Sequence, residues 1–136
     1  MKTLSSKPSK QRKFLYDAPL HIRHKIMSAP LAKELRSEYK TRSIPIREGD
    51  TVVVTRGNYA GIEGKVISID AQKYRASVES VKREKIDGSP VYVSVSSSKI
   101  MIKKLNTDDK WRKEILNRRK VGKVSAKVSA KKVGGK

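Results

Sequence analysis

The sequence has 136 residues and contains no cysteine, which excludes disulfide bonds and thiolate metal sites. Aromatic residues make up only 5% of the chain and hydrophobic residues 36%, below the roughly 45 to 50% apolar share of an average globular protein. We therefore expect a sizeable part of the chain to lie outside any hydrophobic core. No apolar run has the length of a signal peptide or a transmembrane helix, so we expect a cytosolic protein without membrane insertion.

Acidic residues are also scarce: 13 Asp and Glu stand against 33 Lys and Arg, a formal net charge of +20. The excess is concentrated at the two ends. Residues 1–42 and residues 106–136 each hold eleven basic and three acidic residues, or +8, whereas residues 43–105 carry +4. This layout is typical of a small body with basic extensions that lie along nucleic-acid phosphates.

Patterns that would support catalysis or metal binding are weak. Asp50, Glu63 and Asp70 are the only acids grouped near one segment, and we interpret them as exposed strand-end residues rather than a metal triad. His21 and His24 have helical spacing, but no cluster of further ligands completes a metal shell. We therefore predict a protein that is not an enzyme, with no catalytic residue, no metal and no cofactor.

The segment 48–74 is the centre of the chain's organisation. Its two strand-like runs cover residues 51–56 and 65–70. Between them, Gly57 and Asn58 tolerate positive φ, and Gly61 and Gly64 are two further places where the backbone can bend or be approached closely. Phosphate or ribose groups could reach the main chain of this connection without meeting a β-carbon.

Helices and strands are predicted on both sides of this segment. Alternating hydrophobic residues predict strands near residues 74–81, 91–95 and 100–102, and Asp87-Gly88 predicts a hairpin. Pro19 indicates the start of one helix, and a second is expected from residue 29 or 30 to about residue 40, capped by Ser28. A last helix is expected over residues 106–119, with Trp111 and Ile115 packing on the barrel or on RNA.

The predicted fold class is mainly β: a small SH3-like barrel preceded by two short helices and followed by one, with basic N- and C-terminal extensions. The chain then divides into a basic arm that is disordered until it meets a partner (1–13), a helical segment (14–43), the barrel (44–105), a C-terminal helix (106–119) and a flexible basic tail (120–136).

The central segment resembles a KOW motif, a strand–loop–strand unit of RNA-associated proteins, with Gly61 at the position of the central glycine. Three flanking blocks add to it: R-K-F-L-Y-D-A-P from Arg12, S-A-P-L-A-K-E-L-R from Ser28 and I-P-I-R-E-G-D-T-V from Ile44. Together they resemble the archaeal and eukaryotic form of the large-subunit ribosomal protein family numbered twenty-four, over residues 8–119.

The resemblance implies a structural constituent of the large ribosomal subunit in the cytoplasm. Such a protein would bind large-subunit rRNA near its 5′ end, act early in subunit assembly and lie near the polypeptide exit tunnel. The implied partners are rRNA, neighbouring large-subunit proteins and factors that visit the tunnel exit, with no homo-oligomer. The helical segment 14–43 would anchor the barrel on RNA.

The residues expected to contact RNA combine cations, ring side chains and the glycine-rich main chain. They are Lys7, Lys10, Arg12, Lys13, Tyr16, His21, Arg23, His24, Lys25, Lys33, Arg36, Lys40, Arg42, Arg47, Arg56, Gly57, Asn58, Tyr59, Gly61 and Lys65. For Tyr16 the competing interpretation is packing against the body. For Lys33, Arg36 and Lys40 it is a solvated face paired with neighbouring glutamates.

The alternative function is a KOW-type transcription-elongation module that binds RNA polymerase and RNA. Such factors normally join the motif to another domain, and none fits within this length. A membrane-surface role is less favoured because the predicted helices lack a broad apolar face beside the basic one.

Overall fold

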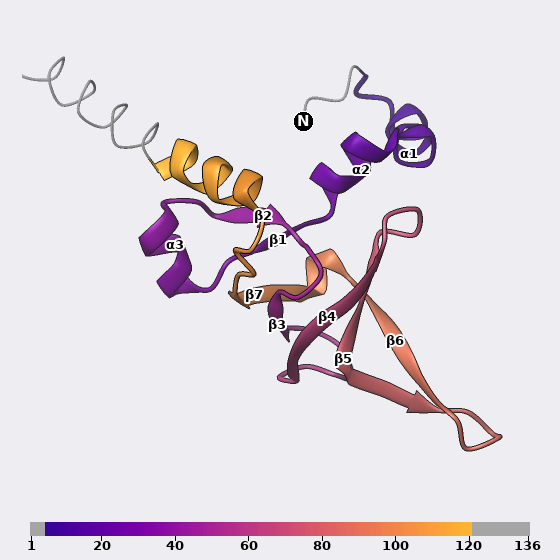
Figure 1. Ribbon diagram of the computed structural model, residues 1–136. Helices are drawn as coiled ribbons and strands as arrows, with labels where there is room; N and C mark the ends of the chain where they lie inside the picture. Colours follow the sequence, from indigo (N-terminus) through magenta and orange to yellow (C-terminus); the bar gives the residue numbers. More distant parts are fainter. Residues whose placement is uncertain (1–4, 121–136) are drawn as a thin grey trace, which may run out of the picture.

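The computed structural model describes residues 5–120 (Figure 1). The predicted tail, apart from Lys120, and the first four residues lie outside this range. The elements before the main sheet are α1 (Pro8–Asp17), α2 (Leu20–Ile26), β1 (Ser28–Pro30), α3 (Lys33–Tyr39) and β2 (Ser43–Pro45). The main sheet contains β3 (Thr51–Val54), β4 (Glu63–Asp70), β5 (Arg75–Glu84), β6 (Pro90–Ser96) and β7 (Ile100–Lys104), with a 3-10 turn η1 (Ser97–Lys99) before β7. A further helix covers residues 110–120 of the described chain.

The main sheet is antiparallel, in the order β6-β5-β4-β3-β7. Its register shifts in three places: at the start of β3, after Val66 in β4, and between Ser77 and Lys82 in β5. Such irregularities bend strands and increase their twist, which lets a short sheet curl around a small core. The prediction of a mainly β, SH3-like fold is confirmed.

The core lies between this curled sheet and the small β1–β2 sheet. Alternate residues of the strands point into it, as Val52 and Val54 do in β3 and Ala76 and Val78 in β5. In β4 the register shift after Val66 lets Ile69 pack against the same core, while Ile67 is 41% exposed.

Two predictions about the N-terminal part were wrong. The arm expected to be disordered is helical from Pro8, because proline suits a first helical turn and the following residues are good helix formers. The helix expected from residue 29 or 30 begins only at Lys33, and its first residues instead form β1, which pairs with β2. Ala29 precedes Pro30 and is therefore biased toward extended backbone, and its side chain is fully buried.

Ser28 is consequently not a helix cap. Its hydroxyl donates to the main-chain oxygen of Lys25 at 2.7 Å, at the end of α2. Three helices therefore precede the barrel rather than the two that were predicted, and the hairpin at Asp87-Gly88 is confirmed, with Gly88 at φ +77°.

The C-terminal helix begins later than predicted, at residue 110, because Asp109 caps it. The Asp109 carboxylate accepts a hydrogen bond from the N–H of Trp111 at 2.9 Å. Leu116 and Arg112 are the buried side chains of this helix, whereas Trp111 is 71% exposed and does not pack on the barrel.

Asp50 was predicted to be exposed, and this was wrong: it is fully buried and forms an ion pair with Arg112, itself 2% exposed. The two guanidinium nitrogens lie 2.6 and 2.7 Å from the two carboxylate oxygens. The carboxylate also accepts the main-chain N–H groups of Arg47 and Asn106, both at 2.9 Å. The partner is 62 residues away in sequence, so no local pattern could indicate it. Glu63 and Asp70 are exposed, as predicted.

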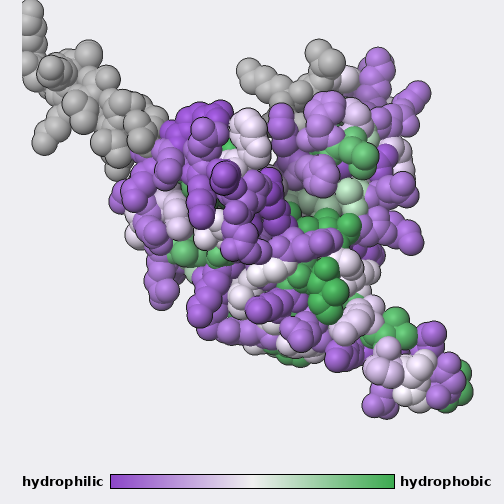
Figure 2. Space-filling view, in the orientation of Figure 1, coloured by the Kyte–Doolittle hydropathy of each residue, from purple (hydrophilic) through white to green (hydrophobic). Residues whose placement is uncertain are grey.

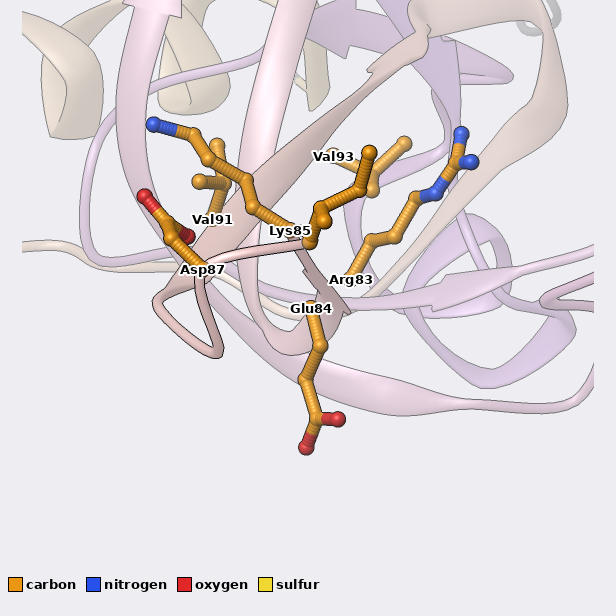
Figure 3. Close-up of a pocket in the computed structure, with 7 residues that line it drawn as sticks. Arg83, Glu84, Lys85, Asp87, Val91 and Val93 are labelled. Atoms are coloured by element: carbon orange, nitrogen blue, oxygen red, sulfur yellow. The ribbon is translucent and has the colours of Figure 1, made fainter.

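Beyond the register shift, β5 and β6 continue as a two-stranded hairpin that projects from the barrel (Figure 1). Figure 3 shows this hairpin around an open hollow of about 700 Å³, with Arg83 and Lys85 on one side of the strand and Glu84 pointing away from them. The hollow contains Val91 and Val93, and Ile86 at the tip is fully exposed.

Candidate RNA-binding surface

The glycine-rich connection between β3 and β4 is a closed, hydrogen-bonded loop. The N–H of Gly61 donates to the oxygen of Val54 at 2.8 Å, and the N–H of Val54 donates to the oxygen of Ile62 at 3.0 Å. Inside the loop, Ala60 N–H donates to Gly57 O at 3.0 Å. The loop is thus held in one conformation by its own backbone, which lowers the ordering cost when a ligand binds.

The three glycines of the motif have two different functions. Gly57 and Gly61 have φ of +100° and +87°, and a β-carbon built on either would have no atom within 4 Å. They allow the turn and leave its main chain open to a ligand. Gly64 is in β4, where an added β-carbon would lie 2.6 Å from the hydroxyl of Ser80 and 2.8 Å from Val78. Gly64 is therefore needed for internal packing.

The predicted contacts around the loop differ in exposure. Arg56 and Asn58 are exposed beside the glycines, and Lys65 is exposed on β4. Tyr59 is half-buried and packs against the core, so only part of its ring can face a ligand.

Helix α1 is a basic helix without a buried residue. Lys7 precedes it, and Lys10, Arg12 and Lys13 are exposed along it. Tyr16 is 79% exposed, so it does not plug against the body as the competing interpretation held. A helix that buries none of its own side chains obtains little stability from the rest of this chain, and its cations and exposed ring suit an RNA surface.

Arg23, which was predicted to contact RNA, makes internal contacts. Its guanidinium donates to the main-chain oxygens of Ala18 and Tyr16, both at 2.6 Å, and to that of Gln72 at 3.2 Å. It also lies over the ring of Tyr74, 5.7 Å from the centroid. The Tyr74 hydroxyl donates to Leu15 O at 2.6 Å. These contacts fasten the junction of α1 and α2 to the β4–β5 turn.

The residues predicted on and after α3 also divide. Lys33, Lys40 and Arg42 are exposed, whereas Arg36 is half-buried and donates to the oxygen of Leu31 at 2.5 Å. Tyr39 packs against the core, and burial, followed by the charge of the adjacent glutamate, raises its pKa. Among residues 5–120, no ion pair joins the cations of this helix to its glutamates, so the lysines remain available to a partner.

The predicted residues thus gather on two surfaces at opposite ends of β4. The loop surface precedes β4 and consists of Arg56, Gly57, Asn58, Gly61 and Lys65. The helical surface is fastened to the turn that follows β4 and consists of the cations and rings of α1 and α2, from Lys7 to Lys25. An eight-residue strand is roughly 26 Å long, so the two surfaces can contact separate RNA segments.

The sequence interpretation named no contact residue in the C-terminal helix, although this helix adds a third group of cations. Lys110, Lys113, Arg118, Arg119 and Lys120 are exposed on it. Their density in the sequence was the available signal. Arg119 donates to Ser43 O at 3.3 Å and lines the same cleft as His21, His24, Lys25 and Arg47.

The described part of the chain holds neither a metal cluster nor a membrane span. Within residues 5–120, no group of three or more His, Asp or Glu side chains is arranged to hold a metal ion. None of the helices in that range is long and apolar enough to cross a membrane.

Comparison with known proteins connects this architecture to a family. The family of ribosomal proteins described as L26 in eukaryotes and, in archaea, by the number twenty-four matches residues 5–119. The chain is 54% identical over 121 residues to the large ribosomal subunit protein uL24 of Korarchaeum cryptofilum, covering 89% of this chain and 92% of the relative. It is 44% identical over 117 residues to the uL24 of Sulfolobus acidocaldarius, covering 86% and 87%.

A third relative, the uL24 of Saccharolobus solfataricus, is 45% identical over 117 residues, which cover 86% of this chain and 98% of the relative. These are names of ribosomal proteins and not of enzymes, in agreement with the sequence prediction. The match includes α1 to α3 and most of the C-terminal helix as well as the motif. The chain therefore belongs to the uL24 family of large-subunit ribosomal proteins, whose eukaryotic members are described as L26.

Proposed function

We propose that this protein is a structural component of the large subunit of the cytoplasmic ribosome and binds large-subunit rRNA near its 5′ end. It joins the subunit early in assembly and lies near the polypeptide exit tunnel, among neighbouring large-subunit proteins. The observation that carries the proposal is the family match over residues 5–119, which includes the flanks of the KOW motif and not the motif alone.

The arrangement of cations supports RNA as the main partner. The loop surface offers open main chain beside Arg56 and Asn58, and the helical surface offers cations with few acids. Both suit recognition of a folded RNA by its backbone and shape, because phosphate contacts position a protein without reading sequence. The internal contacts of Arg23 give the helical surface a fixed place relative to the barrel.

Binding of the full chain to a transcript of the 5′ region of large-subunit rRNA tests the RNA part of the proposal. The affinity should fall steeply with salt, by roughly 0.7 to 0.9 log units per tenfold increase in salt for each neutralised phosphate. A matched transcript of the same length from another rRNA region is the control and should bind more weakly. Equal affinity for both transcripts, or affinity that hardly depends on salt, would refute specific rRNA binding.

Sedimentation of a native cell extract separates this function from that of a transcription-elongation module. The protein should migrate with large subunits and, after a short metabolic pulse, already with their precursor particles. Migration with RNA polymerase instead would favour the alternative.

A further inference from the structure

An open cleft of about 770 Å³ lies between α2, β2 and the C-terminal helix. Its floor is hydrophobic and comes from three elements: Ile44, Pro45 and Ile46 from β2 and its end, Ile69 from β4, and Ile115 from the helix. Figure 2 shows hydrophobic residues gathered in the hollow between the two helical flanks of the molecule, with hydrophilic residues on either side. The cleft belongs to neither the loop surface nor the exposed face of α1.

The rim of the cleft carries groups that suit a nucleotide. His21, His24 and Lys25 line it from α2, and Arg119 lines it from the far end of the C-terminal helix. The imidazole rings are flat enough to stack on a base, and the two cations can bind a phosphate.

The acids of the cleft lie away from this rim. Asp108 and Asp109 are at the start of the C-terminal helix, roughly 15 Å along its axis from Arg119. Asp109 is paired with Arg47 and also caps the helix, so its charge is already used internally. Glu48 is the remaining acid of the lining. The end near α2 is therefore the positive end of the cleft.

The wall formed by the C-terminal helix is fixed by the buried pair of Asp50 and Arg112. Arg112 also donates to Asn106 O at 2.8 Å and to Pro45 O at 3.3 Å, which ties the helix to the floor of the cleft. A cleft whose walls are set before binding loses little entropy when a ligand enters.

We propose that this cleft holds unpaired nucleotides of the bound RNA, with bases on the hydrophobic floor and the sugar–phosphate backbone along Lys25 and Arg119. The inference rests on the proposed rRNA binding and adds a single-stranded site to the two surfaces that contact folded RNA. A segment of a neighbouring protein is the other conceivable occupant, but the cationic end, next to rings and a hydrophobic floor, fits a nucleotide better.

The test uses the full chain and a single-stranded RNA hexamer of mixed sequence, with a duplex of the same length as the comparison. The double variant Lys25→Glu/Arg119→Glu should weaken hexamer binding about tenfold more than the control Lys85→Glu/Lys104→Glu. Both variants change the net charge equally, and the control residues are exposed and lie outside the cleft. An equal loss in the two variants, or a preference for the duplex, would overturn the proposal.

A second measurement does not depend on any variant being folded. Hexamers that carry 4-thiouridine are cross-linked by light to the wild-type chain, and the modified peptides are mapped by mass spectrometry. Cross-links should fall in residues 21–25, 44–48 or 106–119, and cross-links confined to the loop surface or α1 would refute the cleft. In either case, wild-type binding to the structured rRNA transcript reports on the proposed function independently of the cleft.

Discussion

At the residue scale, Gly61 and Gly64 are three positions apart and yet respond to different constraints. Valine at position 64 would place methyl groups against Ser80 and Val78, where a β-carbon alone already lies within 2.8 Å of both side chains. We expect Gly64→Val to lower the free energy of unfolding by about 1 to 3 kcal/mol through overpacking. Urea denaturation measures this, and a stability equal to that of the wild type would contradict the packing argument.

Gly61→Val should be costly for a different reason. The position has φ +87°, which a β-branched residue tolerates poorly, at a cost of about 1 to 2 kcal/mol, and the added side chain also covers main chain that is open to RNA. We therefore expect both lower stability and weaker binding to the rRNA transcript. Ala60→Val is the control, because Ala60 is exposed in the same loop without positive φ. If both variants bind like the wild type, the loop is not an RNA contact.

The buried pair of Asp50 and Arg112 gives a third prediction. Replacing Arg112 by Met leaves a carboxylate at zero exposure with no cation, and we expect a loss of about 3 to 5 kcal/mol in urea denaturation. The double variant Asp50→Leu/Arg112→Met should recover part of this loss, since it removes the unpaired charge. A single Arg112→Met variant as stable as the wild type would show that the pair contributes little.

The sequence alone predicted alternation of buried residues well and partners of polar residues poorly. Val52, Val54, Ala76 and Val78 are buried as their two-residue period indicates. The burial of Asp50 depends on a residue that only the folded chain brings near. In the same way, the cationic character of Arg23 was visible in the sequence, but its acceptors were not.

At the scale of elements, Arg23 links two units that the sequence treated as independent. Replacing it by Gln removes most of the hydrogen bonds that hold the α1–α2 junction to the β4–β5 turn. We expect faster amide hydrogen exchange in α1 and α2 and unchanged exchange in the barrel strands. Lys13→Gln, which removes one exposed cation of α1, is the control. Unchanged exchange in the Arg23 variant would mean that the helices are held by other contacts.

The β5–β6 hairpin has a titratable group at its tip. Hydrogen bonds from the hydroxyl and N–H of Ser89 lower the pKa of Asp87. Because the pKa is lower in the folded hairpin, the stability that these bonds contribute is complete above the unfolded pKa and is lost as the pH falls through the folded value. The tip is therefore best ordered at neutral pH, where the carboxylate is charged.

Elements were predictable where one local signal dominated. The Asp87-Gly88 turn and the start of α2 after Pro19 are of this kind. The second helix failed because its expected first turn forms the strand β1. That strand exists because its partner β2 follows α3, and the pairing of Ala29 with Ile44 buries both side chains. Tertiary pairing overrode the local pattern.

At the scale of the whole molecule, the candidate site is divided by the barrel. The sequence identified most of the residues but placed no distance between them, since that distance is set by the length of β4 and by the contacts of Arg23. The loop surface and the helical surface should therefore contribute separately to RNA binding. Mutations at sites this far apart, with no shared partner, usually have additive effects.

Charge reversal on each surface tests this division. Arg56→Glu changes the loop surface and Lys13→Glu changes the helical surface, both at exposed positions. On the complete 5′ rRNA transcript each should weaken binding, and the double variant should lose the product of the two factors, because phosphate contacts at separate sites add in free energy. Transcripts shortened from either end should include one that is sensitive to only one variant. If every binding transcript responds equally to both, the two surfaces contact the same RNA segment and the separation along β4 has no functional meaning.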